Sequence, residues 1–235
     1  MFDVSKFVEN KSKPLPVVLL LDVSGSMLGE KIKTLNYAVR EMIKSFSEEE
    51  TSASEIWVSI IAFNTTVQKI FSFTSASKIM DIWESKNIRL DASGLTSMGA
   101  ALKIAKDMIE SKDETPSKAY RPTVVLISDG APTDDWETPM QDFISNGRSS
   151  KCDRMAMAIG AGEQEDVLRK FISGTQNALF TSDDASGIVK FFKQVTMSVT
   201  TRKNSKNPNM LLPGSIMGGG STIIIDDDPD NKVSF

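Results

Sequence analysis

The chain has 235 residues, of which 40% are hydrophobic and 25% are charged, as in an ordinary globular protein. The net charge of −4 argues against a general nucleic-acid binder, for which a basic stripe is expected. The sequence contains no histidine and one cysteine, Cys152. These counts exclude Ser-His-Asp and Cys-His catalysis, structural zinc sites and histidine-ligated metals. Any bound metal must therefore be a hard cation held by oxygen atoms.

Neither a membrane segment nor a targeting segment is evident. No run approaches the roughly 18 apolar residues that a spanning helix needs. The first residues, MFDVSKFVENKSKP, lack a basic start followed by an apolar core, so they do not resemble a signal peptide. A single cysteine also allows no internal disulfide. We therefore expect a cytoplasmic protein without a membrane partner.

Strands and helices alternate along the chain. Continuous apolar runs ending at polar turns predict strands buried on both faces, and apolar residues at helical spacing predict the helices. Strands are predicted at 17–21, 56–63, 67–73, 123–127, 153–159 and 178–181, and helices at 31–46, 77–84, 98–109, 135–145, 165–172 and 188–199. The second and third strands are joined by only Asn64-Thr65-Thr66, which forces an antiparallel hairpin. The prediction is an α/β, three-layer, doubly wound (Rossmann-like) domain with a mostly parallel central sheet and one antiparallel edge strand.

Three regions are expected: an N-terminal extension at 1–12, one domain at 13–200 and a C-terminal tail or linker at 201–235. The tail is polar and rich in Gly and Pro, which favours a flexible segment. Alternatively, its Ser221–Ile225 stretch (STIII) adds as a strand or docks in a groove of this molecule or of a partner. The following Asp226–Asp228 are either solvated or offer carboxylates to a basic surface or another metal site.

Polar side chains follow two of the buried strands and open one helix. Asp22, Ser24 and Ser26 follow the first strand, and Asp129 follows the strand at 123–127. Thr96 opens the helix at 98–109. Ligands of open α/β sheets bind beyond the carboxyl ends of the strands, so these loops should converge at one edge. Two carboxylates and three hydroxyls suit a six-coordinate Mg²⁺ or Mn²⁺.

The same residues carry a family resemblance. DVSGSM, with Asp22, Ser24 and Ser26, resembles the DxSxS element of von Willebrand factor type A (VWA) domains. Thr96 in SGLTSMGAAL and Asp129 in LISDGAPTD match the second and third elements of that family, in the expected order. The resemblance covers roughly residues 13–200. Within the family, the segment SDGAPTD is most similar to the TerY type linked to tellurium resistance.

The resemblance implies a metal-ion-dependent adhesion site (MIDAS). Ser24, Ser26 and Thr96 would bind the metal directly, and Asp22 and Asp129 largely through water. Neutral hydroxyls leave most of the cation's charge uncompensated, so the metal favours an Asp or Glu carboxylate of a protein partner as its remaining ligand. This chain is therefore expected to be a metal-dependent adaptor and not an enzyme. The resemblance to the TerY type implies that the adaptor acts in a stress or defence system and that its partner is a kinase or phosphatase of that system.

The alternative is a Mg²⁺-dependent phosphatase of the haloacid dehalogenase type, which also places an Asp after its first strand. Such enzymes need a second Asp two residues later, where this chain has Ser24. Ser24 as a nucleophile would lack an activating histidine. A lysine base remains conceivable, but no lysine adjoins these motifs in the sequence. Phosphate-binding GxxxxGK[ST] and GxGxxG motifs are absent from the expected places.

Overall fold

The computed structural model describes residues 13–51 and 55–210. The predicted extension at 1–12, the STIII stretch and the acidic run at 226–228 lie outside the described residues. The strands are β1 (Leu15–Asp22), β2 (Ile56–Phe63), β3 (Val67–Ser75), β4 (Thr123–Ser128), β5 (Asp153–Ile159) and β6 (Phe180–Ser182). The helices are α1 (Glu30–Glu49), α2 (Ala76–Lys86), α3 (Met98–Glu110), α4 (Glu137–Ser145), α5 (Gln164–Ile172) and α6 (Ser186–Asn204), with short 3₁₀ helices η2 (Gly25–Met27) and η3 (Ser149–Lys151).

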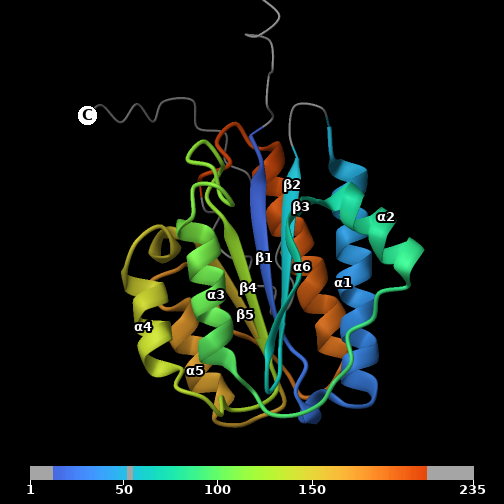
Figure 1. Cartoon of the computed structure of the whole chain (residues 1–235), viewed down its shortest axis with the longest axis vertical. Helices are drawn as coiled ribbons and strands as arrows, with labels where there is room; N and C mark the ends of the chain where they lie inside the picture. The colour runs from blue at the N-terminus through green and yellow to red at the C-terminus, as the bar shows by residue number, and fades with distance from the viewer. Residues whose placement is uncertain (1–12, 52–54, 211–235) are drawn as a thin grey trace, which may run out of the picture.

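The strands form one sheet in the order β3-β2-β1-β4-β5-β6 (Figure 1). All neighbouring pairs are parallel except β2 and β3, which form the expected antiparallel hairpin. The central strands β1 and β4 are buried along their whole length, which explains their continuous apolar sequences. The predicted mostly parallel sheet with one antiparallel edge strand is confirmed.

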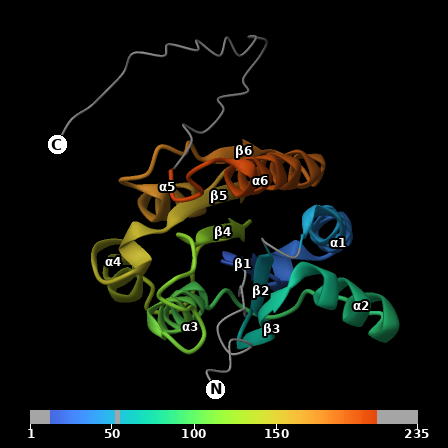
Figure 2. The same ribbon diagram turned by 90° about the horizontal axis from the view of Figure 1, so that it is seen from above.

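Helices cover both faces of the sheet (Figure 2). One apolar cluster joins α1, α2 and α6 to one face, and a second joins α3, α4 and α5 to the other. Alternate residues of β1 point to opposite clusters: Val17 and Leu19 belong to the first, and Val18 and Leu20 to the second. The three-layer arrangement predicted from the sequence is therefore present.

The strand order changes direction at the centre of the sheet. From β1 the chain passes through α1 to β2 on one side, and β4 then pairs with the other side of β1. Adjacent carboxyl ends from which the connections diverge mark the topological switch point, where such sheets bind ligands. Asp22 is the last residue of β1, and Asp129 follows the last residue of β4.

The closing helix α6 continues past residue 200 to Asn204. Arg202 is 1% exposed, and its guanidinium donates hydrogen bonds to the carbonyls of Arg121 and Pro208 and to the Thr123 hydroxyl. The sequence pattern ends the helix near Val199 because basic residues read as a solvated segment. Here a buried, fully bonded arginine extends it.

In the described part of the chain, no helix is both long enough and apolar enough to cross a bilayer.

Candidate metal centre

The first loop of the candidate site is compact and held by its own polar groups. Asp22 is fully buried, and its Oδ1 accepts a hydrogen bond of 2.8 Å from the backbone N–H of Ser24. The chain then turns through η2, which places the Ser24 and Ser26 hydroxyl oxygens 3.0 Å apart. Alternate residues of this turn therefore direct their oxygens to the same region, as the DxSxS spacing predicted.

Hydroxyl groups connect this loop to the end of β4. The Ser26 hydroxyl donates to Asp129 Oδ1 at 2.6 Å, and the Ser128 hydroxyl donates to Asp22 Oδ2 at 2.5 Å. Both bonds cross the switch point between β1 and β4. Ser128 was not among the residues singled out from the sequence, although it directly precedes Asp129 in the same turn.

Thr96 comes to the same place from the loop before α3. Its side chain is almost fully buried, and its backbone exchanges hydrogen bonds with Thr133: Thr96 N–H donates to the Thr133 hydroxyl, and Thr133 N–H donates to Thr96 O. A Cβ atom placed on Gly130 would lie 3.6 Å from Ser26 Oγ and 3.8 Å from Thr96 Oγ1. The structure thus gathers side chains from all three predicted loops at one edge of the sheet.

The β2–β3 turn supports the loop that carries Thr96. Leu95 N–H donates to the Thr65 hydroxyl, and the Ser97 hydroxyl donates to the Thr65 carbonyl. Gly94 has a φ of +74°, and a Cβ there would overlap the Thr65 hydroxyl, so only glycine fits this approach. Gly94 O in turn accepts the backbone N–H of Gly25, which fixes the first and second loops against each other. No sequence pattern pointed to this contact, because it joins segments distant in the chain.

A lysine lies beside the candidate site. Lys31 Nζ, from the first turn of α1, is 2.6 Å from Asp129 Oδ2, and the Asp129 carboxylate is fully shielded from solvent. No lysine adjoins the motifs in the sequence, but the turn at Gly29 starts α1 so that Lys31 faces the end of β4. This ammonium is bonded to the Asp129 carboxylate and to the Ser26 carbonyl.

Burial raises the pKa of Asp22 above its ordinary value. The hydrogen bonds from Ser128 and Ser24 oppose that shift, and the nearby Asp129 carboxylate adds to it. A buried carboxylate with a raised pKa is one whose charge lacks full compensation. Of the two carboxylates, only Asp129 is neutralised by a lysine.

Asp134 caps a helix of the candidate site. Its two carboxylate oxygens accept the backbone N–H groups of Gly99 and Ala100, at 3.0 and 2.9 Å. It therefore caps α3, the helix before it in the chain, and not the next helix. The capped helix begins two residues after Thr96, so this contact also fixes the approach of the Thr96 loop.

The donor set fits a hard cation. The carboxylates of Asp22 and Asp129 and the hydroxyls of Ser24 and Ser26 are joined by hydrogen bonds, and the Thr96 hydroxyl lies near Ser26 across Gly130, so all the side-chain groups are oxygen ligands. Over residues 13–51 and 55–210, no group of three or more Asp, Glu or Cys side chains has a metal-binding arrangement. A cation at this edge would thus depend on serine and threonine hydroxyls.

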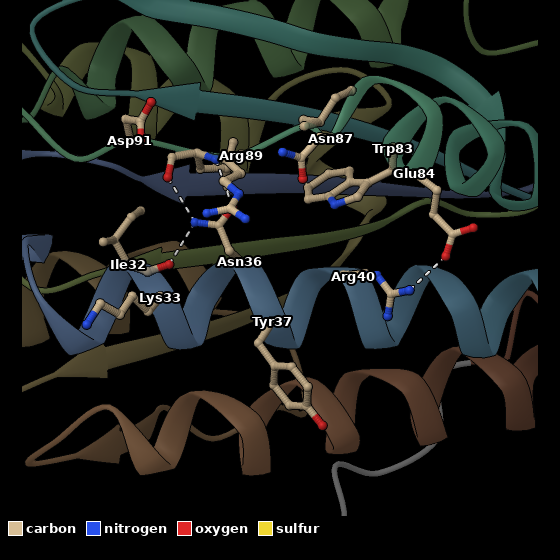
Figure 3. Close-up of a pocket in the computed structure, with 12 residues that line it drawn as sticks. Ile32, Lys33, Asn36, Tyr37, Arg40, Trp83, Glu84, Asn87, Arg89 and Asp91 are labelled. Atoms are coloured by element: carbon tan, nitrogen blue, oxygen red, sulfur yellow. Dashed lines mark hydrogen bonds and ion pairs between the residues drawn. The ribbon is translucent and has the colours of Figure 1, made fainter.

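A separate groove of about 600 Å³ lies between α1 and the segment 83–91 (Figure 3). Asn36 closes its floor: its amide donates to the carbonyls of Ile32 and Leu90, and its Oδ1 accepts the Leu90 N–H. This clamp fixes the segment that leads from α2 toward Thr96. The charged side chains at the rim include Arg40, which pairs with Glu84.

The fold and the site together define a class of protein, a doubly wound α/β domain with a cluster of carboxylates and hydroxyls at its switch point. The family model of the von Willebrand factor type A domain matches residues 17–194 of this chain. This chain belongs to the von Willebrand factor type A domain family. The expected resemblance to that family is confirmed.

Individual relatives are distant. The human voltage-dependent calcium channel subunit alpha-2/delta-2 is 23% identical over 137 residues, which are 55% of this chain and 11% of that protein. This chain therefore spans only about a tenth of that curated relative.

Solved structures share the fold at low identity. Proximal thread matrix protein 1 from the mussel byssus, in a structure described as having a zinc-occupied MIDAS motif, has a TM-score of 0.61 and 17% identity, covering 79% of this chain and 48% of the other. The von Willebrand factor type A protein from Catenulispora acidiphila has a TM-score of 0.57 and 22% identity, covering 80% and 42%.

Proposed function

We propose that the chain is a protein-binding adaptor whose affinity for its partner depends on a divalent cation, Mg²⁺ or Mn²⁺. Ser24, Ser26 and Thr96 would bind the cation directly, and Asp22 and Asp129 through water. The observation that carries the proposal is the convergence of these five side chains, from three separate loops, at the switch point between β1 and β4. The zinc-occupied MIDAS of the mussel relative supports it by family analogy.

The charge balance of the site indicates the partner's chemistry. Lys31 already compensates Asp129, so Asp22 is the one carboxylate of the site left to offset the two positive charges of a bound dication. Hard cations favour oxygen ligands, and they bind charged oxygen ligands more strongly than neutral ones. An Asp or Glu carboxylate of a partner would therefore complete the coordination of the metal. We infer that the partner presents an exposed acidic residue.

The biological setting is proposed on sequence resemblance alone. The SDGAPTD segment after β4 resembles the TerY type, so we propose a cytoplasmic role in tellurium resistance or a related stress response. The partner would then be a kinase or phosphatase of the same system. A pull-down repeated with Mg²⁺ and with a chelator tests this: an acidic partner retained only with Mg²⁺ supports it, and identical captures in both argue against it.

The metal site is tested by thermal melting of the full chain with and without Mg²⁺. A cation that binds only the native state stabilises it by RT ln(1 + [L]/Kd), about 2.7 kcal/mol at 100 times Kd. We expect this stabilisation in the wild type and in Thr96→Ser, which keeps the hydroxyl, and its loss in Asp22→Ala/Thr96→Ala. Asp91→Ala, in an exposed position of the neighbouring loop, is the matched control. A melting temperature that still rises with Mg²⁺ in the double variant would show that the cation binds elsewhere.

The phosphatase alternative has its own experiment. Incubation with a generic phosphate ester should give no Mg²⁺-dependent turnover. Turnover that Asp22→Asn abolishes would overturn the adaptor proposal in favour of an enzyme.

A further inference from the structure

Two exposed leucines flank the candidate metal site. Leu28 is 63% exposed and Leu95 is 57% exposed, and they are two of the few large apolar side chains that the described residues leave in solvent. Leu28 N–H closes the η2 turn onto Gly25 O, and Leu95 directly precedes Thr96. Since Gly25 N–H also bonds to Gly94 O, both leucines lie within three residues of one backbone contact between the two loops. The candidate metal site therefore has two exposed apolar side chains beside its oxygen ligands.

The chain itself contains a segment with the complementary chemistry. Ile223, Ile224 and Ile225 are followed at once by Asp226, Asp227 and Asp228. A carboxylate of this run would supply an anionic ligand to a dication. The adjoining isoleucines would cover apolar surface that solvent otherwise contacts, and burying such surface is favourable in proportion to its area. A further carboxylate of the run would find an opposite charge in Lys31, whose side chain is 31% exposed.

The tail is long enough to reach the site. The described chain ends at Met210, at the amino end of β4, where the Asn209 side chain accepts the backbone N–H of Arg121. In Figure 1 the end of α6 and the start of α1 lie at opposite ends of the sheet. Residues 121 to 129 span roughly 26 Å as a strand. The 16 residues from Met210 to Asp226 can span up to about 55 Å, so the acidic run can pass around the domain.

We propose that residues 223–228 dock on the metal site of the same molecule, with an aspartate carboxylate on the cation and isoleucine side chains against Leu28 and Leu95. This inference rests on the proposed function and adds a regulator to it. A tethered ligand is present at a high effective concentration, so a partner's carboxylate must displace it before binding. The site would therefore select partners whose acidic residue comes with an apolar neighbour.

The test uses the full chain and paramagnetic relaxation by Mn²⁺. With uniformly ¹⁵N-labelled protein, we expect Mn²⁺ to broaden the amide resonances of residues 223–228 strongly, and diamagnetic Mg²⁺ to shift them without broadening. In Asp226→Asn/Asp227→Asn/Asp228→Asn the broadening should disappear, and the Mn²⁺ dissociation constant measured by calorimetry should rise about fivefold or more. The matched variant with three glutamates at these positions keeps the carboxylates and should retain most of the broadening.

A second variant tests the apolar contacts. Leu28→Ser/Leu95→Ser alters exposed side chains and should still bind Mn²⁺, but with reduced broadening of the tail. Unchanged broadening in that variant would overturn the assigned docking surface.

A mixing experiment distinguishes docking between two molecules from docking within one molecule. ¹⁵N-labelled Asp22→Ala/Thr96→Ala protein is combined with unlabelled wild type and Mn²⁺. No broadening of the labelled tail supports docking within one molecule, and broadening there overturns it. If wild-type Mn²⁺ binding is normal and the tail resonances stay sharp, this inference fails while the proposed adaptor function stands. If calorimetry shows no Mn²⁺ binding at all, the proposed function itself fails.

Discussion

At the scale of single residues, the two carboxylates of the candidate site differ in the charges around them. Asp22 is buried at the end of β1 with only hydroxyl and amide donors around it, and burial raises its pKa. Asp129, on the neighbouring strand end, has the Lys31 ammonium as its partner. A bound dication would therefore act differently on the two carboxylates. It would compensate the negative charge of Asp22, and it would compete with the Lys31 ammonium for Asp129.

That competition gives a prediction for Lys31→Met. Removing the ammonium removes a repulsion between the lysine and a bound dication, which at an effective dielectric constant near 20 amounts to a few kcal/mol before solvent and salt reduce it. We expect Mg²⁺ to bind roughly tenfold more tightly, as measured by calorimetry. Lys33→Met, two residues further along α1 with an exposed side chain, should leave the affinity unchanged. Weaker binding in Lys31→Met would mean that Lys31 serves mainly to orient Asp129 for the metal.

At the scale of elements, α3 is held at both ends by carboxylates, one from outside the helix and one of its own. At its start the Asp134 carboxylate accepts the N–H groups of Gly99 and Ala100. At its end the Glu110 carboxylate accepts the N–H of Ser149 at 3.0 Å, which ties the helix to the segment before β5. Because α3 begins beside Thr96, both contacts bear on the candidate site as well as on stability.

Asp134→Ala should cost about 1 kcal/mol of unfolding free energy, the usual value of a lost helix cap. We also expect weaker Mg²⁺ binding, because the capped turn carries the Thr96 loop. Urea unfolding and calorimetry measure the two effects, with the neighbouring exposed Asp135→Ala as control. An Asp134→Ala protein with normal stability and normal metal affinity would show that the cap is dispensable.

Glu110→Gln should show a pH-dependent loss of stability. Burial by itself raises the pKa of Glu110, but backbone N–H groups of Ser149 and Arg148 and the charge of Lys106 outweigh it, and the net pKa is lowered. A lowered pKa means that the ionised group stabilises the fold above the unfolded value near 4.5, and that this stabilisation is lost as pH falls through the folded pKa. We expect Glu110→Gln to be less stable than wild type at pH 7 by about 1 kcal/mol, allowing for solvent screening.

The measurement is urea unfolding of both proteins between pH 3 and 7. The difference should shrink as pH falls below roughly 4.5. A difference that is constant over this range would mean that the glutamate acts by packing alone.

At the scale of the whole molecule, the prediction from sequence succeeded where local pattern decides the structure. Buried strands such as β1 and β4 have unbroken apolar sequences, and the three-residue link between β2 and β3 leaves no geometry other than a hairpin. The position of the site could also be predicted, because the loops after parallel strands meet at the carboxyl edge of the sheet.

The contacts that complete the site could not be predicted in this way. Lys31 and Asp129 are 98 residues apart in the chain, and Thr65 and Leu95 are 30 apart. Such pairs depend on how the loops fold against each other, and no spacing rule links them. Arg202 shows the same limit at the other end of the sheet, because a basic residue in a polar stretch gives no sign that it is buried.

Arg202 should contribute to the stability of the fold and not to metal binding. Its guanidinium satisfies the carbonyls of Arg121 and Pro208 and the Thr123 hydroxyl, and it lies 3.6 Å from an Asp153 carboxylate oxygen. Arg202→Met would remove the donor to these buried acceptors and the positive charge beside the Asp153 carboxylate, which would keep the hydrogen bond from Asn177. Breaking a buried charge pair from one side costs about 3–5 kcal/mol.

We expect the melting temperature of Arg202→Met to fall by roughly 6–20 °C, since each kcal/mol is worth about 2–4 °C in a domain of this size. Lys206→Met, at an exposed position just beyond α6, is the control and should melt like wild type. Because Arg202 lies at the amino ends of β4 and β5, the Mg²⁺ affinity of the folded variant should be unchanged. A large loss of metal affinity would instead show that the two ends of the sheet are coupled, and that α6 transmits the state of one to the other.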